Sequence, residues 1–239
     1  MDRAGGQANP ELREQSLVWE FFDFATEGFF MEVGAHDPKY LSQTWLLERV
    51  GWRGILVEPL PEQCELLRRE RPGSKVHEVA VSSPDKTGTA DFHVCGMFSS
   101  LEKNVADNRI RYEAAITRRV VTLDAILREE NVVALDFLSL DTEGTEFDVL
   151  RGFDIRKYEP RLILIEDTVT GLDKHAHLLS AGYRLVRRTG SNNWYVPRNS
   201  PRDASILDRI RLFRKMYLGT PFRAFRFRRE RRGMGIRGA

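Results

Sequence analysis

Four of the five apolar, strand-like runs in this chain end in carboxylates, the side chains with the clearest capacity for chemistry. These acids are Glu32, Glu58, Asp141, Glu143, Glu166 and Asp167. Because ligands of a parallel sheet bind beyond the carboxyl ends of its strands, we expect the acids to line one site. Such a site favours a ligand with positive charge, and its carboxylates can accept protons from a substrate.

The elements that must position these acids follow from the hydrophobic pattern. Near-continuous apolar runs predict strands at 28–34, 55–58, 76–81, 135–140 and 162–166, with helices at 41–50, 61–71, from Thr122 and after Gly144. Such runs are typical of a parallel sheet covered on both faces, and repeated β-α-β units imply a doubly wound α/β sheet. Two further runs, 183–186 and 193–196, predict a terminal hairpin.

The loop after the first strand argues against a dinucleotide. A pyrophosphate site needs the glycine pattern G-x-G-x-x-G, but residues 34–39 contain only Gly34, and Asp37 and Glu32 would repel phosphate. A cationic head group suits this loop better. Glu58 is placed to accept both hydroxyls of a ribose, and hydrogen bonds to a charged acceptor contribute about 1.5–3 kcal/mol each. A phosphate-free nucleoside with a cationic amino-acid head is S-adenosylmethionine, and a nicotinamide dehydrogenase is the weaker alternative.

Composition and charge exclude several classes of protein. The 239 residues are 41% hydrophobic, too many for a disordered chain, and two cysteines are too few for a disulfide scaffold. A signal peptide and an apolar stretch of bilayer length are both absent from the sequence, so we expect a folded cytoplasmic protein. Residues 198–239 hold 13 Lys and Arg and three acids, a net charge of +10, whereas residues 1–197 carry −8. An acidic body therefore precedes a basic tail.

Seven short motifs occur together in a specific order. They are FMEVGAHD (30–37), SQT (42–44), GWRG (51–54), VEP (57–59), SSL (99–101), VTLD (121–124) and LDTEGTE (140–146). In this order the chain resembles the FkbM family of S-adenosylmethionine-dependent methyltransferases, over about 29–167. The resemblance implies a Rossmann-like class I methyltransferase domain with a seven-stranded, mostly parallel sheet, which we place at 28–198. A helical extension (1–27) would precede it and a basic amphipathic tail (199–239) would follow.

The resemblance and the acidic edge together assign candidate roles. Candidate cofactor-binding residues are Glu32, Gly34, Ala35, His36, Ser42, Glu58, Ala80, Val81 and Asp141. The acceptor implied by the family is a hydroxyl of a sugar-containing or polyketide-type molecule in secondary metabolite biosynthesis. Candidate catalytic residues, which would take up the hydroxyl proton, are Asp141, Glu143, Glu166 and Asp167.

Two versions of that proton transfer stay open. In the first, one carboxylate acts alone as a general base. In the second, Asp141, Glu166 and Asp167 resemble the magnesium site of catechol-type O-methyltransferases, and Mg²⁺ would lower the pKa of the acceptor hydroxyl. From another class, a non-catalytic binding module on the same fold is the alternative to an enzyme.

Two segments suggest partners. The irregular segment 92–119 is expected to cover the acceptor, as long loops in compact domains often do. In the tail, Ile206, Ile210, Phe213 and Tyr217 share one face of a helix. This helix either docks on the acidic body or contacts an anionic or membrane surface; nucleic acid is the least favoured partner, and homo-oligomerisation stays open.

Overall fold

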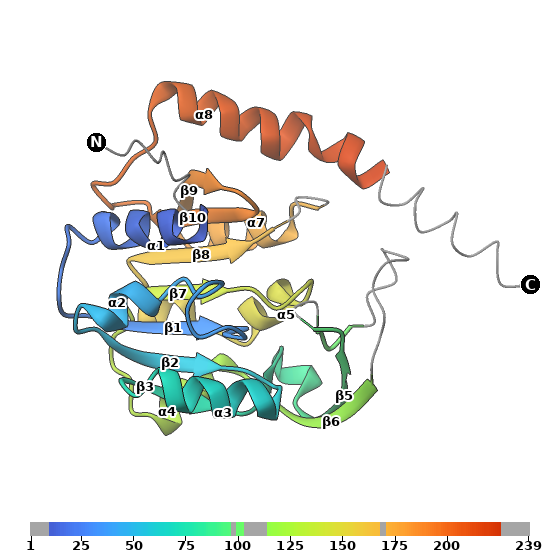
Figure 1. Ribbon diagram of the computed structural model, residues 1–239. Helices are drawn as coiled ribbons and strands as arrows, with labels where there is room; N and C mark the ends of the chain where they lie inside the picture. The colour runs from blue at the N-terminus through green and yellow to red at the C-terminus, as the bar shows by residue number, and fades with distance from the viewer. Residues whose placement is uncertain (1–9, 97–98, 103–113, 168–170, 226–239) are drawn as a thin grey trace, which may run out of the picture.

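A seven-stranded sheet forms the centre of the computed structural model, which describes residues 10–96, 99–102, 114–167 and 171–225, with only the backbone of 10–13 (Figure 1). Its strands are β1 (Phe29–Val33), β2 (Arg53–Val57), β3 (Ser74–His77), β7 (Phe137–Leu140), β8 (Leu162–Glu166), β9 (Tyr183–Thr189) and β10 (Asn192–Pro197). The strand order is β3-β2-β1-β7-β8-β10-β9, and only β10 runs in the direction opposite to the other six strands. The sequence-based prediction of a mostly parallel sheet with a terminal hairpin is therefore confirmed.

The alternation of side chains along the strands divides the core between the two faces of the sheet. On β1, Met31 and Val33 belong to one apolar cluster and Phe30 to the other. On β8, Ile163 and Ile165 lie in the first cluster, while Leu162 and Leu164 lie in the second. Both clusters consist of buried side chains, so the sheet is covered on both faces, as near-continuous apolar strands require.

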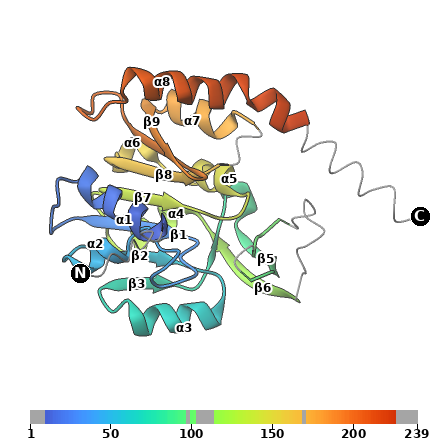
Figure 2. The same ribbon diagram turned by 45° about the horizontal axis from the view of Figure 1, so that its top comes forward.

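Helices supply the two covering layers (Figure 2). The first cluster includes side chains of α4 (Leu123–Glu129), α5 (Glu146–Arg151), α6 (Ile155–Tyr158) and α7 (Asp173–Ser180). The second includes side chains of α1 (Pro10–Phe21), α2 (Trp45–Arg49) and α3 (Pro61–Glu70). The expected N-terminal extension is thus tied into the core: Val18 is fully buried, and the ring of Phe22 packs edge-on against Trp52 at 4.8 Å. In the described part of the chain, no helix is long and apolar enough to span a bilayer.

A second, three-stranded sheet was not expected from the sequence. It consists of β4 (Ala80–Val81), β5 (Gly88–Val94) and β6 (Ala114–Val121) in the order β4-β6-β5, and the short helix η1 (Pro84–Lys86) follows β4. The single strand predicted at 76–81 is therefore wrong, because the chain leaves the main sheet at His77 and pairs with β6 from Ala80. The ends of the segment 92–119, expected to be irregular, lie in β5 and β6, and 97–98 and 103–113 fall outside the described residues.

Two helices also differ from expectation. The helix predicted at 41–50 begins only at Trp45, because Ser42 and Thr44 direct their hydroxyls to the Glu32 carboxylate. The basic tail forms α8 (Ile206–Phe213) and the π-helical turn η2 (Arg214–Leu218) along the β9 edge.

Candidate active site

A cavity of about 750 Å³ opens at the carboxyl edge of the main sheet. Its volume lies within the range of small-molecule sites. Six carboxylates line it: Glu14, Glu32, Glu58, Asp141, Glu143 and Glu166. Among the described lining residues there is no Lys or Arg, so the cavity favours a cationic ligand and disfavours a phosphate.

Gly34 brings the strand ends of this edge close together. Its φ of +82° lies in the left-handed region, and a Cβ at this position would lie 1.8 Å from the backbone oxygen of Asp141. No other residue fits there without a shift of the backbone. The turn is held by the amides of Gly34 and Ala35, which both donate to the carbonyl of Val57, at 2.9 and 3.2 Å.

Glu58 lies beside this turn and is positioned by backbone amides. Its carboxylate accepts hydrogen bonds from the amides of His36 at 3.0 Å and Leu60 at 2.9 Å. Burial outweighs these bonds and raises the pKa of Glu58 to about 7. Because each carboxylate oxygen can accept two hydrogen bonds, Glu58 still has capacity for ligand hydroxyls at the cavity wall.

Glu32 is held by a buried network that sequence reasoning did not find. Its carboxylate accepts from Ser42 Oγ at 2.8 Å, Thr44 Oγ1 at 2.6 Å and the Gln43 amide at 2.5 Å. Arg71, 1% exposed, lies 3.9 Å from Glu32 and donates to both hydroxyls and to Glu48. Even so, burial leaves the pKa of Glu32 raised. In the sequence, Glu32 is the only member of this network that stands at the end of a predicted strand. Arg71 stands at the end of a predicted helix, where a basic side chain is usually solvated, so nothing in the sequence indicates its burial.

The loop that Glu32 holds presents one unsatisfied acceptor. Gln43 lines the cavity, and its buried Oε1 has no hydrogen-bond partner among the described residues. An ammonium group is a donor that such an oxygen can accept. The residues at this end of the cavity therefore fit the cationic amino-acid head of S-adenosylmethionine.

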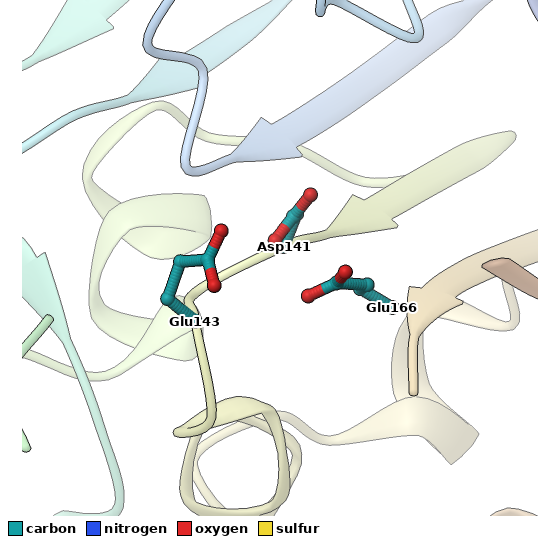
Figure 3. A group of neighbouring side chains, drawn as sticks. All are labelled: Asp141, Glu143 and Glu166. Atoms are coloured by element: carbon teal, nitrogen blue, oxygen red, sulfur yellow. The ribbon is translucent and has the colours of Figure 1, made fainter. Parts of the chain in front are cut away.

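Asp141, Glu143 and Glu166 converge at the other part of the edge (Figure 3). One carboxylate oxygen of each lies within 4.8 Å of the others. Desolvation by the cavity walls, and then the negative charge of Glu166, raise the pKa of Asp141 well above its usual range. Desolvation and the charges of Glu166 and Glu146 raise the pKa of Glu143 to about 7. A carboxyl with a pKa of about 7, as at Glu143, can hold or release a proton near neutral pH.

Asp167 lies in a different environment from this trio. Its carboxylate pairs with Lys174 at 3.1 Å and accepts from Asn193 at 3.1 Å, and it does not line the cavity. The structure thus brings Glu143, rather than Asp167, together with Asp141 and Glu166. Lys174 also pairs with Glu146 at 3.1 Å.

Glu146 orders the loop that carries the trio. Its carboxylate accepts from the amides of Thr142 at 3.1 Å and Gly144 at 2.8 Å, on either side of Glu143. Glu143 itself has a φ of +51°, a conformation that non-glycine residues adopt only when their surroundings hold them there. Sequence reasoning assigned Glu146 only a place at the start of a helix.

The remaining candidate residues fall on both sides of the cavity wall. His36, Ala80 and Val81 line the cavity, the last two as part of an apolar wall with Phe92. Ala35 and Ser42 are buried behind it. Residues that sequence reasoning missed also line the cavity: Glu14 from α1 and the turn 189–192. The two are joined because Glu14 accepts a hydrogen bond from Asn192 at 2.8 Å.

The topology and the edge that carries the cavity define a Rossmann-like class I methyltransferase, with a strand order that places an antiparallel strand between the last two parallel ones. A family model described as the methyltransferase FkbM domain matches residues 32–185, well over half of the chain. The chain belongs to this family of S-adenosylmethionine-dependent methyltransferases.

Comparison with curated proteins finds no match. Solved structures similar to the chain include a precorrin-6y C5,15-methyltransferase from Geobacter metallireducens (10% identity, 76% of this chain and 85% of that one, TM-score 0.39). A putative RNA methyltransferase from Pyrococcus horikoshii matches with 11% identity over 83% of this chain and 86% of that one (TM-score 0.43). A TehB-like S-adenosylmethionine-dependent methyltransferase from Corynebacterium glutamicum matches with 12% identity over 81% and 90%, at a TM-score of 0.39.

Proposed function

We propose that the protein transfers the methyl group of S-adenosylmethionine to a hydroxyl oxygen of a sugar-containing or polyketide-type metabolite. The observation that carries this proposal is the lining of the cavity at the carboxyl edge of the sheet in an FkbM domain. Six carboxylates line this cavity, and none of its described lining residues is a Lys or Arg. The cofactor supplies an electrophilic methyl group on a sulfonium. The protein has to bind the cofactor and the acceptor, orient them, and deprotonate the acceptor hydroxyl.

The binding roles divide between the two ends of the cavity. Glu58 accepts the ribose hydroxyls, and the loop around Gln43, ordered by Glu32, holds the amino-acid head. Ala80, Val81 and Phe92 supply the apolar wall for the adenine. Each assignment uses a group that lines the cavity and has hydrogen-bonding capacity or apolar surface left for a ligand.

The proton of the acceptor hydroxyl passes to the trio of Asp141, Glu143 and Glu166. An isolated carboxylate is a weak base at neutral pH, but a pKa of about 7 at Glu143 matches the range in which general bases work best. The acceptor oxygen must also lie about 3–3.5 Å from the methyl carbon with water removed. We place the reaction at the trio rather than at Glu58, whose pKa is also about 7, because Glu58 is assigned to the ribose hydroxyls of the cofactor.

Two measurements test the proposal. Calorimetry should detect binding of S-adenosylmethionine and not of NADH, and mass spectrometry of hydroxylated acceptors incubated with enzyme and donor should show the gain of one CH₂. Absence of donor binding, or tight binding of NADH, would contradict the proposal. Donor binding without turnover on any acceptor would favour the non-catalytic module instead.

The base and metal versions are separated by substitution and chelation. Glu143→Gln should lower kcat by about 10²–10⁴-fold with little effect on the affinity for the donor, and Glu78→Gln, at a partly exposed glutamate outside the cavity, is the matched control. Activity that survives extensive chelation supports the metal-free base. Activity that chelation abolishes and Mg²⁺ restores would assign the trio to a metal instead, as its all-oxygen donor set would permit.

A further inference from the structure

The basic tail forms a helix whose apolar face points away from the domain. The chain is helical from Ile206 to residue 225 with one break at Gly219, and Figures 1 and 2 show it along the outer side of the β9 edge. Its large apolar side chains are exposed: Ile206, Leu207, Ile210, Phe213, Tyr217, Leu218, Phe222 and Phe225. Ile206 is 77% exposed, Phe213 55% and Phe222 78%. Of the face predicted from sequence, only Tyr217 touches the body, where its hydroxyl forms a hydrogen bond with His175 of α7 at 3.0 Å; Ile206, Ile210 and Phe213 are exposed.

A different set of side chains attaches this helix to the domain. Leu212, Met216 and Thr220 are buried, at 9%, 1% and 8% exposure, and follow one another in steps of four residues. In an α-helix such steps drift by about 40° each. The π turn, in which the Gly219 amide donates to the Arg214 carbonyl at 2.8 Å, offsets that drift. All three side chains consequently stay on the domain side, and the apolar stripe stays exposed on the outer side, with Tyr217 at its margin against His175.

Basic side chains accompany the exposed stripe. Arg209, Arg211, Arg214 and Lys215 are all exposed, and Asp208 is the only acid between 205 and 225. The residues from 198 onward carry a net charge of +10. The arginines among 226–232 and Phe227 add to the pattern in sequence but lie outside the described residues.

We propose that this helix lies on the surface of a membrane that contains anionic lipids. Exposed isoleucine, leucine and phenylalanine side chains would enter the boundary of the acyl chains, and the arginines would contact the negative head groups. An apolar stripe flanked by cationic residues on a helix too short to cross the bilayer is the pattern of an interfacial helix. This proposal does not depend on the proposed function.

Two other occupants fit the same face less well. A second copy would bring the helix against itself, and the five cations between 205 and 225 would then meet the same five across the interface, with only Asp208 and the neighbouring Asp203 paired to them. Nucleic acid would use the arginines and could stack bases on Phe213 and Phe222. Nucleic acid would not cover the exposed aliphatic side chains of Ile206, Leu207 and Ile210.

The test uses the full chain and vesicles of defined composition. We expect cosedimentation with phosphatidylcholine vesicles that contain phosphatidylglycerol, and at least several-fold weaker binding to pure phosphatidylcholine or at about 0.5 M salt. Phe213→Glu should lower the partition coefficient about tenfold. Because Phe213 is more than half exposed, this variant should keep the wild-type thermal midpoint, which is measured in parallel.

Val133→Glu is the matched control. Val133 lies between α4 and β7 and is 92% exposed, so the same change there should leave vesicle binding as in the wild type. Absence of binding to anionic vesicles, or equal loss in both variants, would overturn the proposal. A dimer in light scattering that Phe213→Glu dissociates, without vesicle binding, would assign the face to a second copy. Retention of RNA in place of vesicles would assign it to nucleic acid.

Discussion

Two groups of carboxylates at the same edge of the sheet have different surroundings. Glu58, Asp141, Glu143 and Glu166 face the cavity, and in the described part of the chain none of them forms an ion pair with Lys or Arg. Glu32 also borders the cavity but pairs with the buried Arg71, and Glu146 and Asp167 share Lys174. Glu32 and Glu146 order backbone loops, whereas the cavity acids without a cation beside them can pair with a cationic ligand.

The difference teaches how to separate support from chemistry among residues of one type. A strand-end carboxylate is a candidate ligand group when its charge has no built-in partner and desolvation raises its pKa, as at Glu58 and Glu143. A strand-end carboxylate with a buried cation beside it maintains the shape of the site. Four predictions test this division.

Arg71→Met should have the largest effect. It removes the cation from a buried network and leaves Glu32 and Glu48 without compensation, which typically lowers the free energy of unfolding by about 3–5 kcal/mol. Urea denaturation measures the loss. Arg68→Met is the control, because the exposed pair of Arg68 with Glu78 should contribute less than about 1 kcal/mol. Equal effects of the two variants would remove the distinction between the groups.

Lys174→Met should have a smaller effect on stability and a visible effect on catalysis. Lys174 is 19% exposed, so water can partly compensate Glu146 and Asp167, and we expect a loss of about 1–3 kcal/mol in the free energy of unfolding. Because Glu146 orders the loop around Glu143, kcat should fall while the affinity for the donor stays near the wild type. Lys86→Met, at an exposed pair with Asp148, should change neither quantity.

Glu58→Gln should weaken binding of S-adenosylmethionine about tenfold without unfolding the protein. The amide is nearly isosteric but lacks the charge that strengthens hydrogen bonds to the ribose hydroxyls, and the loss of one charged hydrogen bond is worth about 1.5–3 kcal/mol. Calorimetry gives the dissociation constant. Unchanged affinity in this variant would show that Glu58 belongs with the supporting acids.

The smallest expected effect is the pH dependence of donor binding. With a pKa of about 7, Glu58 is mostly protonated at pH 6 and mostly ionised at pH 8, so affinity should rise about fivefold over this interval when the protonated form binds as weakly as Glu58→Gln. In Glu58→Gln, the affinity for the donor should depend less on pH over the same interval. The free energy of unfolding of the ligand-free chain should move the opposite way, falling from about pH 4.5 to 7, because the folded state then holds protons that the unfolded chain has released.

The apolar runs were sufficient to predict the main sheet, because a strand buried on both faces must be apolar throughout. They failed at β4, β5 and β6. In β6 the exposed Ala114, Ala115 and Arg119 interrupt the pattern, and pairing with β5, rather than a deep core, makes it a strand. The tail shows the same limit. The sequence indicates the amphipathic face, but whether that face points toward the domain or toward solvent depends on the burial of Leu212 and Met216 and on the π turn.

By itself the sequence determined that acids end neighbouring strands, that a phosphate-binding glycine loop is absent, and that the motifs are those of the FkbM family. These features are local, so residue type and spacing along the chain are enough to reveal them. Only the tertiary structure decided which acids have a cation beside them, because Arg71, directly after α3, and Lys174, in α7, pair with Glu32 and Glu146, which are distant in sequence. Charge compensation depends on distance and burial in space, and neither can be read from neighbours along the chain.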